Sequence, residues 1–170
     1  MARKKTKLKT TPLPELAEIS IWRKQCAGLC FLVLGGLAAI QQEGGFDQVV
    51  FGIVLGAIFG LGVVAIVGRL AKYLNRELVQ KHGEARFNAL LYESSLMLIP
   101  FTVLAVLSKM FFGWNAAIPF SSAALVGFGA TFGVALGKLG DTKRIPLLVV
   151  TGGTPFCLGV VWTFLISLLR

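Results

Sequence analysis

The stretch Gln48–Gly68 reads QVVFGIVLGAIFGLGVVAIVG and carries no charged side chain. An α-helix rises about 1.5 Å per residue, and the hydrocarbon core of a bilayer is about 30 Å thick, so roughly 20 apolar residues are enough to cross it. A second uncharged stretch of comparable length, Ala116–Gly137, follows later in the chain. These two stretches predict membrane-spanning helices.

The composition extends this prediction to the whole chain. Of its 170 residues, 55% are hydrophobic and only 15% are charged, and the mean hydropathy is +0.77. Soluble domains average about 25% charged residues. We therefore predict an all-α integral membrane protein, a single bundle of about five glycine-rich transmembrane helices behind a basic tail, residues 1–25. The expected spans are residues 26–42, 48–68, 88–108, 118–137 and 145–169.

The distribution of Lys and Arg predicts how the chain crosses the membrane. With five spans and the N-terminus in the cytoplasm, three cytoplasmic segments hold 15 of the 17 Lys and Arg residues: Met1–Gln25, Arg69–Phe87 and Lys138–Arg144. Only Lys109 and Arg170 then lie outside. If the first, short segment did not cross, this asymmetry would disappear. Because cytoplasmic loops are enriched in Lys and Arg, the pattern favours five spans.

The formal net charge of +9 could in a soluble protein indicate nucleic acid. Here the basic residues flank apolar stretches instead of gathering in one basic domain, so we expect anionic lipid headgroups and no nucleic acid as the partner of this charge. A multi-pass chain with this charge pattern is expected in a bacterial-type cytoplasmic membrane or its organellar equivalent.

Glycines recur at four-residue intervals in two of the predicted spans. This spacing aligns them along one helix face, where helix backbones can approach closely, as in a glycine zipper. The faces either pack within the chain or form an interface with another membrane protein or a second copy. The short sequences at 56–60 and 129–133 also resemble each other, which leaves an internal repeat possible. The candidate packing residues are Gly52, Gly56, Gly60, Gly129, Gly133 and Gly137.

Glu93 is the only acidic residue inside a predicted span. A carboxylate in hydrocarbon is costly unless it is paired, protonated or near water, so it often marks a site. One interpretation pairs it with a nearby base, for which Arg69, Arg86 and Lys138 are candidates. The other places it in a cytoplasm-facing polar pocket beside a helix break at 151–155. The residues of that candidate polar site are Glu93, Tyr92, Thr151 and Thr154.

Several chemistries have no support in the sequence. His82 is the only histidine, and it falls in a predicted loop, so multi-histidine metal or haem ligation within the chain is excluded. Cys26 and Cys30 are four residues apart, which is not a C-x-x-C redox spacing, and Cys157 leaves an odd number. We expect no catalytic residue, no metal and no cofactor, and we do not expect an enzyme.

Two functions remain. The first is a non-enzymatic accessory or assembly subunit of a larger membrane protein complex, favoured by the small size, the glycine faces and the scarcity of polar residues in the spans. The alternative is a small oligomeric transporter or channel, or the substrate-binding subunit of one, with its site at Glu93 and the 151–155 break. The sequence leaves the partner and the substrate open.

Overall fold

The computed structural model describes residues 20–41, 45–114, 116–139 and 147–168. Five helices in this part of the chain are long and apolar enough to cross a membrane: Ile21–Ile40, Phe46–Leu74, Glu84–Phe112, Ala117–Leu139 and Val149–Ser167. The predicted multi-pass, all-helical architecture is thereby confirmed. The basic tail lies outside the described residues as far as position 19.

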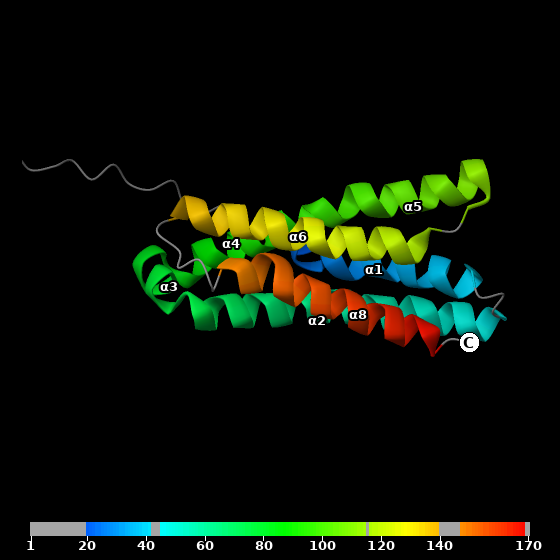
Figure 1. Cartoon of the computed structure of the whole chain (residues 1–170), viewed down its shortest axis with the longest axis horizontal. Helices are drawn as coiled ribbons and strands as arrows, with labels where there is room; N and C mark the ends of the chain where they lie inside the picture. Colours follow the sequence, from blue (N-terminus) through cyan, green and yellow to red (C-terminus); the bar gives the residue numbers. More distant parts are fainter. Residues whose placement is uncertain (1–19, 42–44, 115, 140–146, 169–170) are drawn as a thin grey trace, which may run out of the picture.

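The helices form one elongated bundle (Figure 1). In chain order they are α1 (Ile21–Gln41), α2 (Phe46–Leu74), α3 (Arg76–His82), α4 (Glu84–Ser94), the 3-10 turn η1 (Ser95–Met97), α5 (Leu98–Phe112), α6 (Ala117–Leu139), the π-helical turn η2 (Val149–Gly153) and α8 (Thr154–Ser167). α1 is the central span: 56% of it is buried, against 22–44% of the others. It lies between α2 on one side and α5 and α6 on the other.

The helices extend beyond the predicted spans at their charged ends. α1 begins at Ile21, five residues before the predicted start, and includes Arg23 and Lys24. Such side chains do not end a helix at the membrane surface, because their long aliphatic stems let the charged groups reach the headgroup layer. α2 likewise continues past Gly68 to Leu74. Gly83, with φ +84°, then separates α3 from α4 in a backbone conformation that favours glycine.

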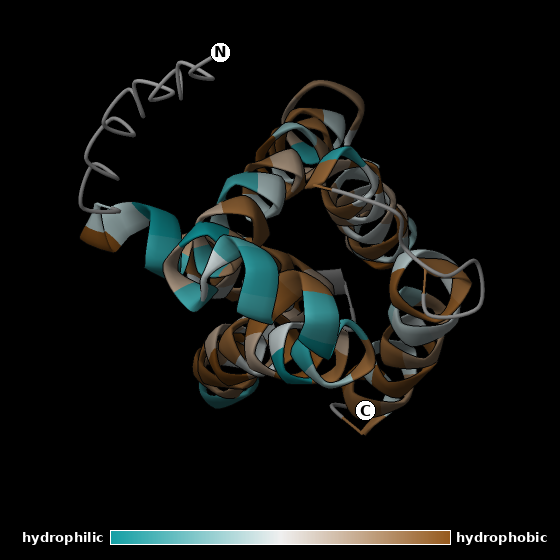
Figure 2. Cartoon of the chain, turned by 90° about the vertical axis from the view of Figure 1, so that its left-hand side faces the viewer, coloured by the Kyte–Doolittle hydropathy of each residue, from teal (hydrophilic) through white to brown (hydrophobic). Residues whose placement is uncertain are grey.

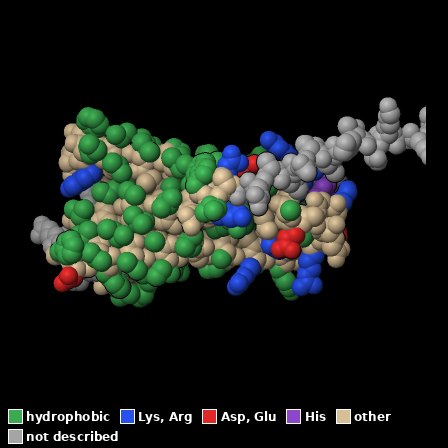
Figure 3. All heavy atoms as spheres, turned by 180° about the vertical axis from the view of Figure 1, so that it is seen from behind, with side chains coloured by type: hydrophobic (Ala, Val, Ile, Leu, Met, Phe, Trp, Pro, Cys, Tyr) green, Lys and Arg blue, Asp and Glu red, His purple; other side chains and the backbone are tan. Residues whose placement is uncertain are grey.

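Charge and hydropathy divide the bundle along its length. On the face that Figure 3 shows, hydrophobic side chains are spread over the long part of the bundle, and most of the visible Lys and Arg side chains lie toward the end that holds α3. The view onto that end shows the hydrophilic residues concentrated there (Figure 2). The bundle therefore has the long apolar belt and the polar end expected of a membrane protein.

An aromatic cluster joins three spans in the interior. Phe31 of α1 contacts Phe59 of α2 and Trp162 of α8 edge-on, with ring centroids 5.2 and 5.1 Å apart, and Phe59 and Trp162 lie 4.8 Å apart. Phe31 and Trp162 are fully buried. Offset and edge-to-face contacts of this kind add roughly 0.5–1.5 kcal/mol per pair beyond simple burial.

The first glycine face packs inside the chain, against α1. A Cβ added to Gly56 would overlap the carbonyl oxygen of Phe31, and one added to Gly60 would overlap that of Ala27. At Gly52 it would lie 2.7 Å from the carbonyl oxygen of Gly35. The backbones of α1 and α2 therefore touch along several turns, which only residues without a side chain permit.

The second glycine face is divided. A Cβ on Gly129 would lie 2.7 Å from the carbonyl oxygen of Thr151 and would overlap Pro155, and one on Gly133 would overlap Thr151. η2 and the start of α8 thus pack against these two glycines. Gly137 differs from the sequence expectation: among the described residues nothing lies within 4 Å of its added Cβ, so it takes no part in this packing.

Alanine substitutions should separate packing glycines from the rest. Gly56→Ala should lower the free energy of unfolding by about 1–3 kcal/mol, because α1 and α2 must separate to admit the methyl group. Gly62→Ala, on the same helix but with nothing within 4 Å of its added Cβ, should leave stability unchanged or raise it by up to about 1 kcal/mol. Unfolding of the purified protein by titration with a denaturing detergent measures both. Equal stability of the two variants would contradict the packing described above.

Candidate functional site

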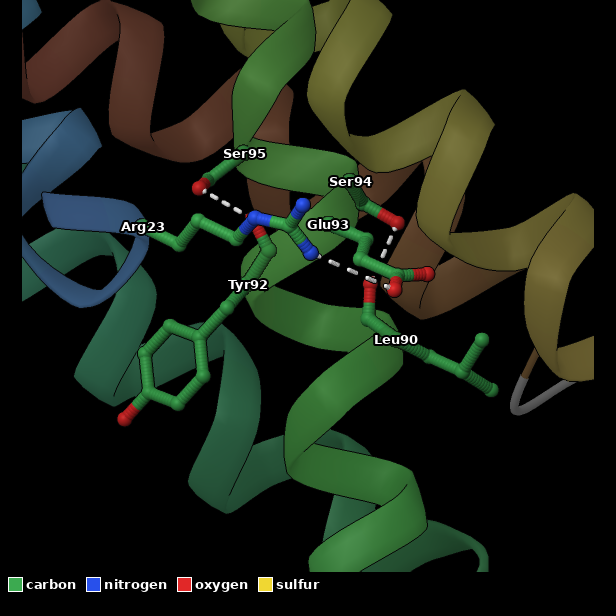
Figure 4. A network of polar contacts seen from close by, with 6 residues as sticks. All are labelled: Arg23, Leu90, Tyr92, Glu93, Ser94 and Ser95. Atoms are coloured by element: carbon green, nitrogen blue, oxygen red, sulfur yellow. Dashed lines mark hydrogen bonds and ion pairs between the residues drawn. The ribbon is translucent and has the colours of Figure 1, made fainter. Parts of the chain in front are cut away.

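Glu93 and Tyr92 lie on the last turn of α4, at the level where α1 begins (Figure 4). The Glu93 carboxylate forms an ion pair with Arg23, with Oε1 and Nη1 3.8 Å apart. Both side chains are partly open, 54% and 41% exposed respectively. The base that pairs with Glu93 is therefore none of the three predicted from sequence. Arg23 is available because α1 starts earlier than its hydropathy suggests.

Thr151 and Thr154 belong to a helix interruption. Pro155 has no N–H to donate to the carbonyl of Thr151, and the chain accommodates this with the π-helical turn η2. The Thr151 hydroxyl donates to the carbonyl of Leu147 at 2.9 Å, and that of Thr154 donates to the carbonyl of Val149 at 2.8 Å. Both hydroxyls thus satisfy backbone carbonyls of their own helix.

The four predicted polar residues are engaged separately. Glu93 pairs with Arg23, whereas the methyl group of Thr151 packs on the Gly133 face of α6. The Tyr92 ring points away from the Glu93 carboxylate (Figure 4) and lines a cavity to which neither threonine contributes. The structure thus places Glu93 against α1 and Thr151 against α6, while the Thr154 hydroxyl bonds within its own helix.

That cavity, which we call the basic cavity, lies between α1, α2 and α4 and has a volume of about 260 Å³. Three cationic side chains line it, beside polar Asn88 and Tyr92 and an apolar floor. From the sequence, these cations served to orient the chain and to predict anionic headgroups as their partner, and Arg69 was one candidate base for Glu93; that they line one cavity was not predicted. The helical spacing of Leu61, Ala65, Arg69 and Lys72 could have shown that they share one face of α2. The position of Lys24 beside that face could not be predicted, because Lys24 belongs to another helix. The lining residues are Lys24, Leu61, Val64, Ala65, Gly68, Arg69, Lys72, Asn88, Leu91 and Tyr92.

The charges of the basic cavity are incompletely balanced. Lys72 forms an ion pair with Glu84 at the start of α4. Within the described part of the chain, Lys24 and Arg69 have no salt bridge. Two positive charges therefore remain beside the cavity, at the boundary between the apolar belt and the charged end.

A second cavity is an open groove on the outer surface, between α6 and α8, with a volume of about 280 Å³. We call it the α6–α8 groove. Its walls are mostly apolar, and small residues interrupt them at Ser122 and Gly159. The other lining residues are Val126, Pro155, Phe156, Val160 and Thr163.

The cysteines do not form a site. Cys26 and Cys30 are buried, Cys157 is exposed, and all three are free thiols. Cys26 Sγ lies 3.7 Å from the carbonyl oxygen of Ser95, which ties α1 to η1. No group of three or more His, Cys, Asp or Glu residues in the described ranges is arranged to hold a metal ion.

The chain matches no protein family model, and comparisons with curated proteins and with solved structures found no match. What the protein does is therefore inferred from its own cavities, charges and packing.

Neutralising Glu93 should have a small structural effect. Because the ion pair with Arg23 is half-exposed, Glu93→Gln should lower the free energy of unfolding by less than about 1 kcal/mol. Arg23→Gln serves as the matched partner variant, and the double variant tests whether the two effects are coupled. Denaturing-detergent titration measures all three. A loss as large as that expected for Gly56→Ala would show that this pair is a structural element of the bundle.

Proposed function

We propose that this protein is a non-enzymatic accessory or assembly subunit of a larger membrane protein complex. The observation that supports this proposal best is the α6–α8 groove. It lies on the outer surface, where a transmembrane helix of another chain could lie against it. A helix partner would exclude lipid from a surface that the described helices leave uncovered.

The walls of the groove have the composition of a helix-packing surface. Phe156, Val160 and Val126 are 69%, 56% and 51% exposed. Between them, Gly159 leaves room: the nearest atom to its added Cβ is the Ser122 hydroxyl, at 3.9 Å. Helices associate in lipid through close van der Waals contact, and small residues such as these allow the approach.

The first glycine face is not available for this purpose. Gly52, Gly56 and Gly60 are buried against α1, so a partner cannot reach them without displacing a span. An accessory role therefore needs another surface, which makes the α6–α8 groove the better candidate.

The alternative, a small oligomeric transporter or channel or its substrate-binding subunit, has less support. It requires polar groups free to meet a solute. Among the described residues, five buried polar side chains each donate to the backbone of their own helix or turn: Asn75, Ser94, Ser95, Thr102 and Ser121. The buried side-chain nitrogens without a hydrogen-bond partner in this part of the chain are Arg23 Nε, His82 Nε2 and the indole N–H of Trp162, and they lie on different helices. Glu93 and Thr151, the core of the predicted transport site, are engaged with different helices.

For orientation, we propose that the basic end faces the cytoplasm, in a bacterial-type cytoplasmic membrane or its organellar equivalent. The positive-inside rule supports this, since α3 and the neighbouring ends of α2, α4 and α6 carry most of the described basic residues. The same orientation places anionic headgroups beside those residues.

Cysteine labelling tests the orientation. In a Cys157→Ser background, Lys81→Cys lies at the basic end and Asp47→Cys at the opposite end, and both positions are exposed. A membrane-impermeant maleimide applied to intact cells should label Asp47→Cys, and should label Lys81→Cys only after permeabilisation. The reverse pattern would place the N-terminus outside.

Substitution in the groove tests the accessory function. The tagged protein is extracted from its native membrane in mild detergent, and co-purifying chains are quantified. Gly159→Leu should reduce a stoichiometric partner at least about tenfold, because its side chain fills the groove. Gly62→Leu, on α2 and outside the groove, is the matched control and should retain the partner.

Two results would contradict the accessory function. One is a lone monomer or homo-oligomer in the wild-type extract. The other is a stoichiometric partner that Gly159→Leu retains as well as Gly62→Leu does. Either would direct attention to flux measurements in proteoliposomes with Glu93→Gln.

A further inference from the structure

We propose that the basic cavity binds one acidic phospholipid, with the phosphate of its headgroup beside Lys24 and Arg69 and the start of an acyl chain along α2. The site is supported by two cations that have no salt bridge among the described residues and that lie beside an apolar floor at the edge of the apolar belt. It is distinct from the α6–α8 groove and shares no lining residue with it.

The charge of the cavity selects an anion. Lys24 comes from the first turn of α1, whereas Arg69 and Lys72 come from the last turns of α2. Since Lys72 is paired with Glu84, its charge is largely balanced, and the pair connects α2 to α4 at one side of the cavity. Lys24 and Arg69 have no such partner among the described residues, so a phosphate between them would balance charge that the described helices leave uncompensated.

Neighbouring polar groups suit a phosphate ester. The side chains of Asn88 and Tyr92 line the same cavity from α4 and offer an amide and a phenolic hydroxyl as hydrogen-bond donors. The only acidic side chain near Tyr92 on its helix is Glu93, which is directed to Arg23 and does not line the cavity. Among the described residues that line the cavity, no carboxylate opposes an anion.

The apolar half of the cavity argues for a lipid over a free anion. Leu61, Val64 and Ala65 continue the lining down α2, away from the charged end. Leu61 is 49% exposed, so this part opens onto the outer surface of the apolar belt. Inorganic phosphate or a small soluble anion would make no apolar contact with this half of the cavity, whereas an acyl chain would pack against it and bury it.

The site lies at the level where the described part of α1 begins. α1 begins at Ile21, while α2 and α4 both extend beyond it towards the charged end. The cavity lies beside this first described turn of α1, between α2 and α4, where the apolar belt meets the charged end. Trp22, which is 50% exposed on the same turn, is a residue typical of that level.

Lipid retention by the purified full chain tests the proposal. The protein in mild detergent is supplied with phosphatidylglycerol or with phosphatidylcholine of the same acyl chains, and bound lipid is measured by native mass spectrometry. We expect one phosphatidylglycerol to be retained in preference to phosphatidylcholine. Lys24→Gln/Arg69→Gln should weaken that retention by roughly tenfold or more, given about 1 kcal/mol per basic residue at an anionic surface.

The matched control removes the same charge elsewhere. Lys81→Gln/Arg86→Gln changes two exposed basic residues at the same end that do not line the cavity. Retention by this variant should stay within about twofold of the wild type. If both double variants lose lipid equally, the attraction is a general surface effect and the proposed site is wrong. Circular dichroism and gel filtration verify that each variant is folded and monodisperse.

A third variant distinguishes a phospholipid from a free phosphate. Ala65→Phe fills the apolar half and keeps every charge, so it should reduce phosphatidylglycerol retention. Inorganic phosphate at millimolar concentration should not displace the lipid. Bound phosphatidylglycerol should raise the melting temperature, because a ligand of the folded state stabilises it, and inorganic phosphate should not. Displacement by phosphate, or full retention by Ala65→Phe, would overturn the lipid assignment. None of these results depends on a protein partner, so they are independent of the accessory function.

Discussion

The close contact between α1 and α2 is the constraint on which the rest of the bundle depends. In lipid, apolar side chains gain little by leaving hydrocarbon for each other, so helices associate through van der Waals contact at short range. Gly35 of α1 meets Gly52 and Gly56 of α2, and the carbonyl groups of Phe31 and Ala27 lie where side chains at Gly56 and Gly60 would otherwise project. This contact holds α1 in the centre of the bundle, where α1 also contacts α5 and α6.

The position of α1 along the bundle then decides the chemistry of the charged end. Its first turn carries Arg23 and Lys24, and packing against α2 holds both at the level of the last turn of α4. Arg23 thereby meets Glu93, while Lys24 faces the side of α2 that carries Arg69. The first turn of α1 thus both pairs the Glu93 carboxylate with a base and adds a cation to the basic cavity.

The two cavities suit different partners because their surroundings differ. The α6–α8 groove is nearly all apolar and contains small residues, so the side chains of a partner helix could pack into it. The basic cavity combines cations with an apolar floor, so it fits a molecule that is charged at one end only. Since the two linings share no residue, the proposed lipid and the proposed partner helix would not compete for the same side chains.

The number of spans and their approximate limits follow from the sequence, because a helix that crosses hydrocarbon must be long and apolar. This requirement is local: residues 48–68 meet it without reference to the rest of the chain. The glycine spacing likewise predicts close helix contact. Which helix each glycine face would meet, and that Gly137 would meet none of the described helices, depends on contacts between distant segments. The same is true of the Arg23–Glu93 pair and of Lys24 beside Arg69. Side chains 70 and 45 positions apart in the chain become neighbours only when helices pack, and no local pattern encodes that distance.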